Sequence, residues 1–199
     1  MNFSLTERTR VPLLPPEPFL YPDNLFADPE AGPSKERRWW VLHTRPRAEK
    51  ALARSLLGRG IPFFLPIYHR RWRSSGRARN AYMPLFPGYL FLLGEPSSSL
   101  EAYQTRQVAK CLKVDDQARL HNDLVRVHQL VTCGSLLTPE KGLQPGTPVE
   151  IIDGPLAGLQ GKILRQGKKL KFVVEVHFIQ RGASVEIDAS MIRRLNGVG

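Results

Sequence analysis

The stretch Pro84-Leu85-Phe86-Pro87-Gly88-Tyr89-Leu90-Phe91-Leu92-Leu93 decides how the rest of the chain is arranged. Two prolines fix φ and remove backbone donors on either side of Phe86, so the chain must enter this stretch extended. Gly88 relieves the crowding, and residues 89–93 form an apolar run of strand length. The stretch therefore predicts a buried strand with a rigid lead-in that holds a large aromatic side chain, Phe86, at the rim of a sheet.

The bulk composition limits the class of protein. The 199 residues carry a formal net charge of +11, which favours polyanions or an anionic surface as partners. The only two cysteines, Cys111 and Cys133, lack the paired spacing of a disulfide framework or a zinc site. The sequence also lacks an N-terminal apolar segment and a membrane-spanning run. We therefore expect a cytoplasmic protein with no membrane association.

Residues 1–37 are rich in proline, carry mixed charges and show no periodicity. Such a segment cannot repay its ordering entropy, so it is predicted to be an extended or disordered arm. A few apolar side chains interrupt it: Phe19, Leu20, Tyr21, Leu25 and Phe26. They are either a docking motif or a patch that lies against the first domain, and we favour the second interpretation.

The next part, residues 38–133, predicts an α+β domain. Strands are expected over residues 39–43, 67–73, 79–83, 89–93 and 108–114, with a short strand or bridge over 61–66. Helices are expected over residues 46–58, 100–106 and 122–131, the last capped by Asn122 or Asp123. This order is typical of a ferredoxin-like domain, in which an antiparallel sheet is packed against helices.

Two groups of cations in this domain are candidates for contact with nucleic acid. The first comprises a loop and the first helix, with Arg45, Arg47, Lys50 and Arg54. The second is a protruding hairpin with Arg70, Arg71, Arg73, Arg77 and Arg79, interleaved with Trp72 and Tyr82. Basic residues beside aromatics suit backbone contact plus stacking on an exposed base. The alternative is that both groups are solvated surface charge.

The composition changes again after the third helix. Residues 134–144 resemble a linker, and residues 145–199 contain short strands with frequent glycine, expected over 149–152, 162–165, 171–178, 184–187 and 191–194. The segment 171–178 alternates apolar and polar residues, as a half-buried strand does. A small β-barrel is the predicted fold of this part, with no helical form in isolation.

Three stretches together resemble the NusG/RfaH family of proteins that ride on RNA polymerase. Trp39-Trp40-Val41-Leu42-His43 and the stretch around Phe86 resemble the family's NGN domain. The segment from Val149 to Ile163, with Asp153-Gly154-Pro155-Leu156-Ala157-Gly158, resembles the KOW motif of an SH3-like barrel. The resemblance covers residues 38–196. It implies a transcription elongation or antitermination factor, and the arginine-rich hairpin and the N-terminal arm suggest a specialised paralogue.

The resemblance also implies partners and site residues. An apolar cavity of the NGN domain would bind the clamp helices of the largest polymerase subunit through Phe86, with Tyr89 and Trp40 as neighbours, unless these aromatics simply fill the core. The non-template DNA strand is an implied contact of basic residues, here Arg45, Arg47, Lys50, Arg54, Arg70, Arg71, Arg73 and Arg77. Ser97-Ser98-Ser99 lies where the family has a polar loop, but without a threonine-rich pattern. The KOW domain would recruit a ribosomal protein or Rho to a monomeric factor.

Catalysis has little support in this sequence. The five histidines, 43, 69, 121, 128 and 177, are scattered, and no P-loop, nucleophile elbow or paired carboxylates accompany them. We expect no enzyme activity, no cofactor and no metal. The alternative function is a ribosome-associated or RNA-binding KOW protein that does not act on polymerase.

Overall fold

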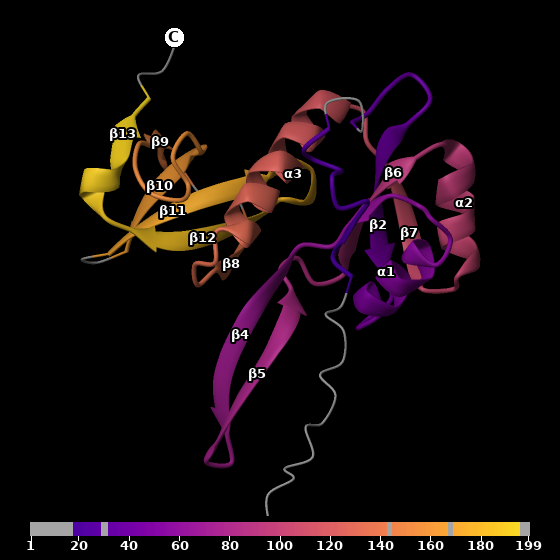
Figure 1. Ribbon diagram of the computed structural model, residues 1–199, viewed down its shortest axis with the longest axis horizontal. Helices are drawn as coiled ribbons and strands as arrows, with labels where there is room; N and C mark the ends of the chain where they lie inside the picture. Colours follow the sequence, from indigo (N-terminus) through magenta and orange to yellow (C-terminus); the bar gives the residue numbers. More distant parts are fainter. Residues whose placement is uncertain (1–17, 29–31, 143–144, 167–168, 196–199) are drawn as a thin grey trace, which may run out of the picture.

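The computed structural model describes residues 18–28, 32–142, 145–166 and 169–195, and Figure 1 shows their arrangement. The first sheet has five strands in the order β1-β3-β6-β2-β7, and every pair in it is antiparallel. Its bounds are β1 Leu20–Tyr21, β2 Arg38–Thr44, β3 Phe63–Phe64, β6 Tyr89–Gly94 and β7 Val108–Lys113. Leaving aside β1 and the two strands within residues 67–84, which form a sheet of their own, the order is β2-α1-β3-β6-α2-β7, the β-α-β-β-α-β order of a ferredoxin-like domain.

Opposite faces of this sheet are covered by different helices. Leu42, Leu90 and Leu92 point towards α1 (Glu49–Leu57) and α2 (Pro96–Gln104), where Leu52 and Ala102 complete an apolar cluster. Val41, Phe91 and Leu93 point the other way, towards α3 (Gln117–Thr132). The period of two along each strand sends successive side chains to opposite faces, so β2 and β6 contribute to both layers.

The starts of all three helices differ from the predictions. Helix α1 begins at Glu49 rather than Pro46, because Arg47 has a positive φ of 61°, which a right-handed helix does not allow. Helix α2 begins at Pro96 rather than Leu100, because proline is tolerated in the first turn where no backbone donor is needed. Ser97, Ser98 and Ser99 are therefore helical and not a loop. Helix α3 begins at Gln117, where the carboxylate of Asp116 accepts a hydrogen bond from the Arg119 amide at 2.9 Å. Asp123, one of the two predicted caps, instead lies buried inside the helix.

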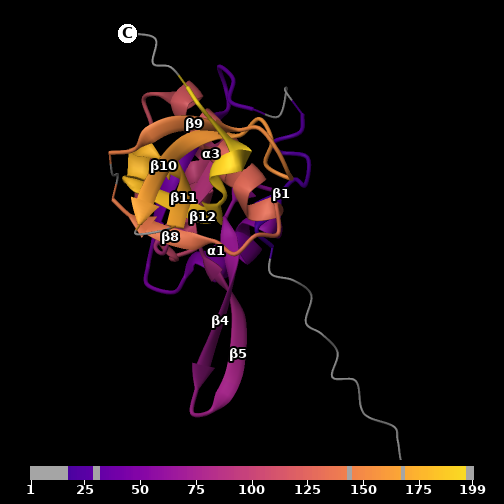
Figure 2. The ribbon, with the colours of Figure 1, turned by 90° about the vertical axis from the view of Figure 1, so that its left-hand side faces the viewer.

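Strands β4 (Ile67–Ser74) and β5 (Arg77–Pro84) form a two-stranded hairpin that projects away from the body of the molecule (Figures 1 and 2). Its register pairs Ile67 with Pro84 at the base and Ser74 with Arg77 at the tip. Ser75 and Gly76 close the turn with positive φ values of 51° and 74°. The protruding hairpin predicted from the sequence is present in the structure.

The C-terminal part is a second antiparallel sheet, in the order β13-β9-β10-β11-β12-β8. Its strands are β8 Thr138–Lys141, β9 Thr147–Ile151, β10 Gln160–Gln166, β11 Lys169–Val176, β12 Arg181–Ile187 and β13 Ile192–Arg194. Two 3-10 helices, η2 His177–Ile179 and η3 Ala189–Met191, accompany them. No register joins the edge strands β8 and β13 within the described residues, so the predicted closure into a barrel is not observed.

Residues 138–141, predicted to be linker, form the edge strand β8, which pairs with β12. The sequence did not predict this strand because proline and charged residues are depleted in strands and are tolerated mainly at sheet edges.

The C-terminal sheet packs on the first domain. Helix α3 lies between the two sheets (Figure 1), and a single apolar cluster runs from Trp39 and Phe91 through Leu124 to Phe172 and Val174.

Part of the N-terminal arm is ordered, contrary to the prediction of disorder. Leu20 and Tyr21 pair with Phe64 and Phe63, and Leu25 is fully buried. Phe26 packs edge-on against Phe64 at a centroid distance of 5.0 Å. The apolar patch therefore lies against the first domain, as our favoured interpretation required. Residues 1–17 and 29–31 of the arm lie outside the described residues.

Candidate nucleic-acid and partner interface

Phe86 lies in the core and not on the surface. Its side chain is 2% exposed and packs edge-on against Phe91, with ring centroids 6.3 Å apart. The nearby Gly88 adopts a φ of +85°, which favours glycine. Its amide donates to the Glu49 carboxylate at 2.7 Å, and its carbonyl accepts from the Thr44 amide at 2.8 Å. Hydrogen bonds at Gly88 and the packing of Phe86 in the core thus hold the segment before β6 in place.

The two aromatic neighbours proposed for Phe86 lie on opposite faces of the sheet. Tyr89 is half-buried on the face that carries Phe91, and its ring meets His43 at 5.3 Å. Trp40 packs with the α1 and α2 cluster, and its indole N–H donates to the Gly94 carbonyl at 3.2 Å. The placement of Trp40 beside Phe86 is therefore wrong, because adjacent strand residues alternate in direction.

Arg45 lies at a cavity of about 690 Å³ where β2 ends and β7 begins. Arg106, from the turn after α2, lines the same cavity together with Thr44 and Tyr103. Arg106 holds a positive φ of 59°, a conformation that is uncommon for arginine and is enriched at functional sites. Within the described chain, neither arginine side chain forms an ion pair with a carboxylate.

Thr44 makes this cavity unusual. Its side chain is 2% exposed, yet its hydroxyl has no hydrogen-bond partner, the only such buried side-chain atom in the described parts of the molecule. A buried hydroxyl without a partner costs free energy, and native structures satisfy nearly all such groups. A ligand with hydrogen-bonding oxygens, held by Arg45 and Arg106, would supply the missing partner. Phosphate matches both requirements.

The other predicted cations of the first helix divide between two places. Arg47 and Lys50 meet Arg70 of the hairpin around an apolar cavity of about 350 Å³, which Tyr68 and Met83 also line. Arg54, near the C-terminal end of α1, is on neither cavity. The row of cations predicted from the sequence is thus not one surface. It is two basic sites on either side of the N-terminus of α1.

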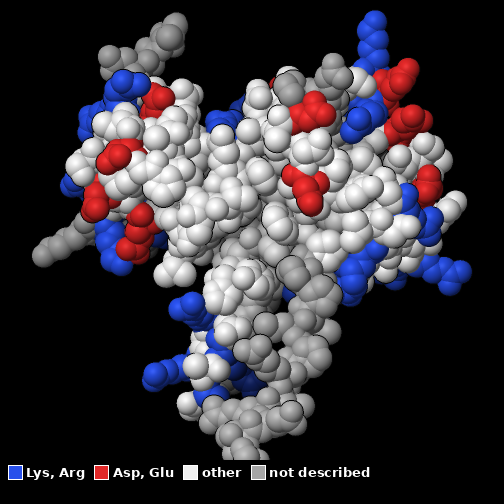
Figure 3. Space-filling model, in the orientation of Figure 1, with Lys and Arg blue, Asp and Glu red and all other residues white. Residues whose placement is uncertain are grey.

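The hairpin carries the remaining arginines into solvent. Arg70, Arg71, Arg73, Arg77 and Arg79 are all exposed, and blue side chains crowd the projecting element in Figure 3. No carboxylate pairs with any of them in the described residues. Five cations without counter-charge on a projecting element form a surface suited to a polyanion.

Comparison with known proteins identifies the first domain. A family model described as transcription termination factor nusG matches residues 37–127, which include β2 to β7 and most of α3. Residues 37–127 belong to the NusG family. The predicted resemblance is confirmed for this domain, and the match ends before the C-terminal sheet begins.

Other comparisons add little to the NusG-family match. One similar solved structure is described as "Crystal Structure of MjSpt4:Spt5 complex conformation B"; it is 16% identical, the match covers 80% of this chain and 97% of that chain, and the TM-score is 0.27. A score this low says nothing further about the fold of this protein. No curated protein matches the chain.

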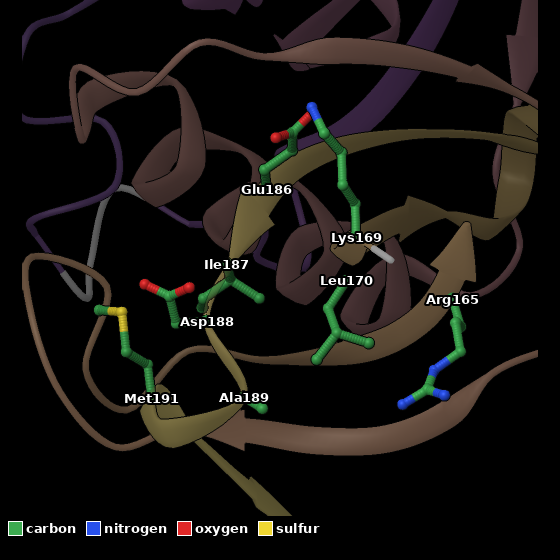
Figure 4. A pocket seen from close by; sticks show the side chains of 8 residues that line it. All are labelled: Arg165, Lys169, Leu170, Glu186, Ile187, Asp188, Ala189 and Met191. Atoms are coloured by element: carbon green, nitrogen blue, oxygen red, sulfur yellow. The ribbon is translucent and has the colours of Figure 1, made fainter. Parts of the chain in front are cut away.

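The sheet that follows the NusG-family domain has a cavity of its own, shown in Figure 4. Its volume is about 760 Å³, and it is lined by the side chains Arg165, Lys169, Leu170, Glu186, Ile187, Asp188, Ala189 and Met191. Lys169 and Glu186 meet at one edge of it and form an ion pair at 2.8 Å. Charges of both signs therefore line this cavity, whereas the described residues that line the cavity of Arg45 and Arg106 include no acidic residue.

His121, His128 and Cys111 are half-buried side chains of the first domain. The pKa values of His121 and His128 are lowered by burial, and burial raises the pKa of the Cys111 thiol despite a hydrogen bond with Ser99. No group of His, Cys, Asp or Glu that could hold a metal ion occurs among the described residues. Over the same residues, no helix is long and apolar enough to span a membrane.

Sequence reasoning missed three members of the candidate site. Arg106 and Tyr103 lie more than fifty residues from Arg45, and only the antiparallel pairing of β2 with β7 brings them together. Thr44 resembled an ordinary strand end. The sequence did contain an indication for Arg106, because an arginine between a predicted helix and a predicted strand indicates an exposed charge in a turn.

Proposed function

We propose that this NusG-family protein is a transcription elongation factor that binds the clamp helices of RNA polymerase and contacts nucleic acid with its basic cavities. The observation that carries the proposal is the cavity of Arg45, Arg106 and the unpartnered Thr44 hydroxyl on a NusG-family domain. Binding energy specific to the closed, elongating polymerase would favour that state over the paused state by population shift. Suppressed pausing and antitermination follow from that preference.

The nucleic-acid contact proposed here is a phosphate of the non-template DNA strand in the Thr44 cavity. Two guanidinium groups would hold the phosphate oxygens, and the Thr44 hydroxyl would donate to one of them. Arg47, Lys50 and the hairpin arginines would contact neighbouring phosphates. Arg54 is left out of this contact because it lies on neither cavity.

The polymerase contact proposed here uses the rim of the Phe86 stretch. Pro87 is exposed and Tyr89 is half-buried, so these side chains can meet a helix of the partner. Phe86 lies beneath them and fixes their position. Trp40 is excluded from this contact because it lies on the opposite face of the sheet.

We propose further that the C-terminal sheet is an SH3-like KOW module that recruits a second partner, such as a ribosomal protein or Rho. The support is the motif around Gly154 and Gly158, whose φ values of +82° and +85° are those the turn requires. β9 and β10 of that motif are neighbouring antiparallel strands of the sheet.

A polymerase experiment tests the proposal. The intact chain should bind purified core RNA polymerase and shorten pauses on a synthetic elongation scaffold. The double variant Arg45→Ala/Arg106→Ala should bind polymerase alone normally but lose its effect on pausing. The matched control is Arg165→Ala/Arg194→Ala, which removes the same charge from the C-terminal sheet. Failure of the intact chain to bind polymerase would refute the elongation-factor proposal.

The second candidate function is an RNA-binding or ribosome-associated KOW protein. The net charge of +11 favours it independently of polymerase. It requires affinity for structured RNA that falls steeply with salt, because counterions are released from the phosphates on binding. A protein that binds ribosomal RNA in this way and ignores polymerase would support this candidate over the first.

A further inference from the structure

The two faces of the β4–β5 hairpin differ in chemistry. The register pairs Trp72 with Arg79 and Arg70 with Ala81, and the period of two places these four residues on one face. The face continues to Ser74 and Arg77 at the tip. His69, Arg71 and Arg73 of β4 lie on the opposite face with Tyr82, Asn80 and Ala78. We name the first the Trp72 face and the second the Tyr82 face.

The Trp72 face presents an accessible indole surrounded by cations. The Trp72 side chain is 38% exposed, and the Arg70 guanidinium lies 5.7 Å from its ring centroid. Arg79 is its direct cross-strand partner. An exposed indole is costly to keep in water, and a π-face beside fixed cations is the arrangement that proteins use to stack an unpaired base next to its phosphates.

The Tyr82 face is organised differently. Tyr82 is 54% exposed, but its ring is engaged by His69 at a centroid distance of 5.2 Å and a tilt of 44°. Arg71 stands opposite Asn80 and Arg73 opposite Ala78, so no arginine of this face is the cross-strand partner of an aromatic ring. Among the described residues, the cation–π contact of the hairpin lies on the Trp72 face.

The Trp72 face also leads into the body of the molecule. Tyr68 and Met83, paired at the base of the same face, line the apolar cavity that Arg47, just before α1, and Lys50 of α1 also line. From Ser74 to Tyr68 the strand runs about 20 Å. A continuous track of cations and apolar rings therefore extends from the hairpin tip to the N-terminus of α1.

We propose that the Trp72 face is a binding track for single-stranded nucleic acid, with an unpaired base stacked on Trp72 and its phosphates held by Arg70, Arg79 and Arg77. The proposal deepens the proposed function by naming which face of the hairpin binds and that the strand must be unpaired. A base inside a duplex cannot offer its π-face to Trp72, so duplex DNA would gain only from the arginine charges.

The test uses the full chain and fluorescein-labelled oligonucleotides of mixed sequence, as single-stranded DNA, single-stranded RNA and duplex DNA. Single strands should bind more tightly than the duplex and should quench the emission of the exposed Trp72. Trp72→Ala should weaken single-strand binding by about tenfold, while Trp72→Phe, which keeps a π-face, should lose much less. The DNA and RNA arms decide which single strand is preferred.

Matched variants on the Tyr82 face control for charge and for aromatic area. Arg79→Ala should weaken binding more than Arg71→Ala, and Trp72→Ala more than Tyr82→Ala. All four side chains are exposed on the hairpin, and a thermal melt of each variant checks the fold. Equal losses on both faces, or equal affinity for duplex and single strand, would overturn the proposal.

The outcomes separate this inference from the proposed function. A chain that binds polymerase but shows no dependence on Trp72 for single strands would overturn the inference and leave the elongation factor standing. A chain that ignores polymerase yet binds single strands through Trp72 would support the inference and overturn the elongation factor.

Discussion

At the scale of single residues, burial decides what each aromatic of the NusG-family domain can do. Phe86, Tyr89 and Trp40 were predicted to lie together, but Phe86 is in the core, Tyr89 is half-buried beside His43, and Trp40 is on the other face of the sheet. The sequence predicted that all three lie at one interface, because a family motif specifies residue types and not the direction of their side chains. Only the sheet register determines direction.

We predict that Phe86→Ala lowers the free energy of unfolding by about 3–5 kcal/mol, because it leaves a cavity against Phe91. Urea denaturation of the variant and the wild type measures this loss. Tyr82→Ala, at an exposed position on the hairpin, is the control and should leave the midpoint unchanged. A Phe86→Ala protein of normal stability that fails to bind polymerase would show instead that Phe86 reaches the surface.

At the scale of elements, the N-terminal segment 18–28 acts as a part of the NusG-family domain. It adds β1 to the sheet and sets Phe26 against the side chains of α3, with His128 at a centroid distance of 4.9 Å and His121 at 6.2 Å. The sequence predicted its apolar patch but not its order. The proline content of this segment argues against a helix or a central strand. It does not argue against a two-residue strand at a sheet edge, where proline is tolerated.

The docking of this segment should depend on pH. The Trp39 indole N–H donates to Nδ1 of His121 at 3.3 Å, and burial lowers the pKa of both histidines below the usual 6.5. The unfolded chain therefore takes up protons more readily than the folded one, so stability is complete above about pH 6.5 and falls as the pH drops through the folded pKa values.

Urea midpoints at about pH 7.5 and pH 5.5, a range in which ordinary carboxylates do not titrate, measure this loss. The variant His121→Gln/His128→Gln should show a smaller difference between the two midpoints than the wild type. Phe26→Ala should lower stability at both pH values, since it removes the apolar contact itself. An unchanged pH dependence in the double histidine variant would contradict the explanation.

At the scale of the whole molecule, a buried carboxylate joins the NusG-family domain to the C-terminal sheet. Asp123 of α3 is only 1% exposed. Its carboxylate accepts a hydrogen bond from the His177 backbone amide at 3.0 Å, and the same carboxylate oxygen lies 3.1 Å from His177 Nδ1. The other ring nitrogen of His177 lies 3.7 Å from Glu175, which forms an ion pair with Lys162 at 2.7 Å. The polar contact and the apolar cluster around it hold the two parts together.

We predict that Asp123→Ala loosens the two parts without unfolding either of them. The His177 amide would lose its acceptor at a cost of about 1–3 kcal/mol. Small-angle scattering should show a larger radius of gyration, and the two parts should tumble with separate correlation times by NMR. Glu186→Ala, which breaks an exposed ion pair inside the C-terminal sheet, is the control. A variant as compact as the wild type would show that the apolar cluster alone holds the parts.

The arrangement of the two parts was beyond the reach of the sequence. Strand periodicity, turn residues and the Phe86 stretch predicted the order of elements in the first domain and most strands of the second. Contacts such as Asp123 with His177 join residues more than fifty positions apart, and no local pattern marks them. The Thr44 cavity was missed for the same reason, since its lining comes from two separate turns and a strand edge.

The short connection between α3 and β8 has a consequence for every partner of this protein. Only residues 133–137 separate Thr132 from Thr138, a span of at most about 22 Å when extended. After the interface opens, each part still experiences the other at an effective concentration in about the millimolar range. A competitor for the α3 surface must therefore either bind very tightly or be tethered nearby itself, as a factor already held on a large assembly would be.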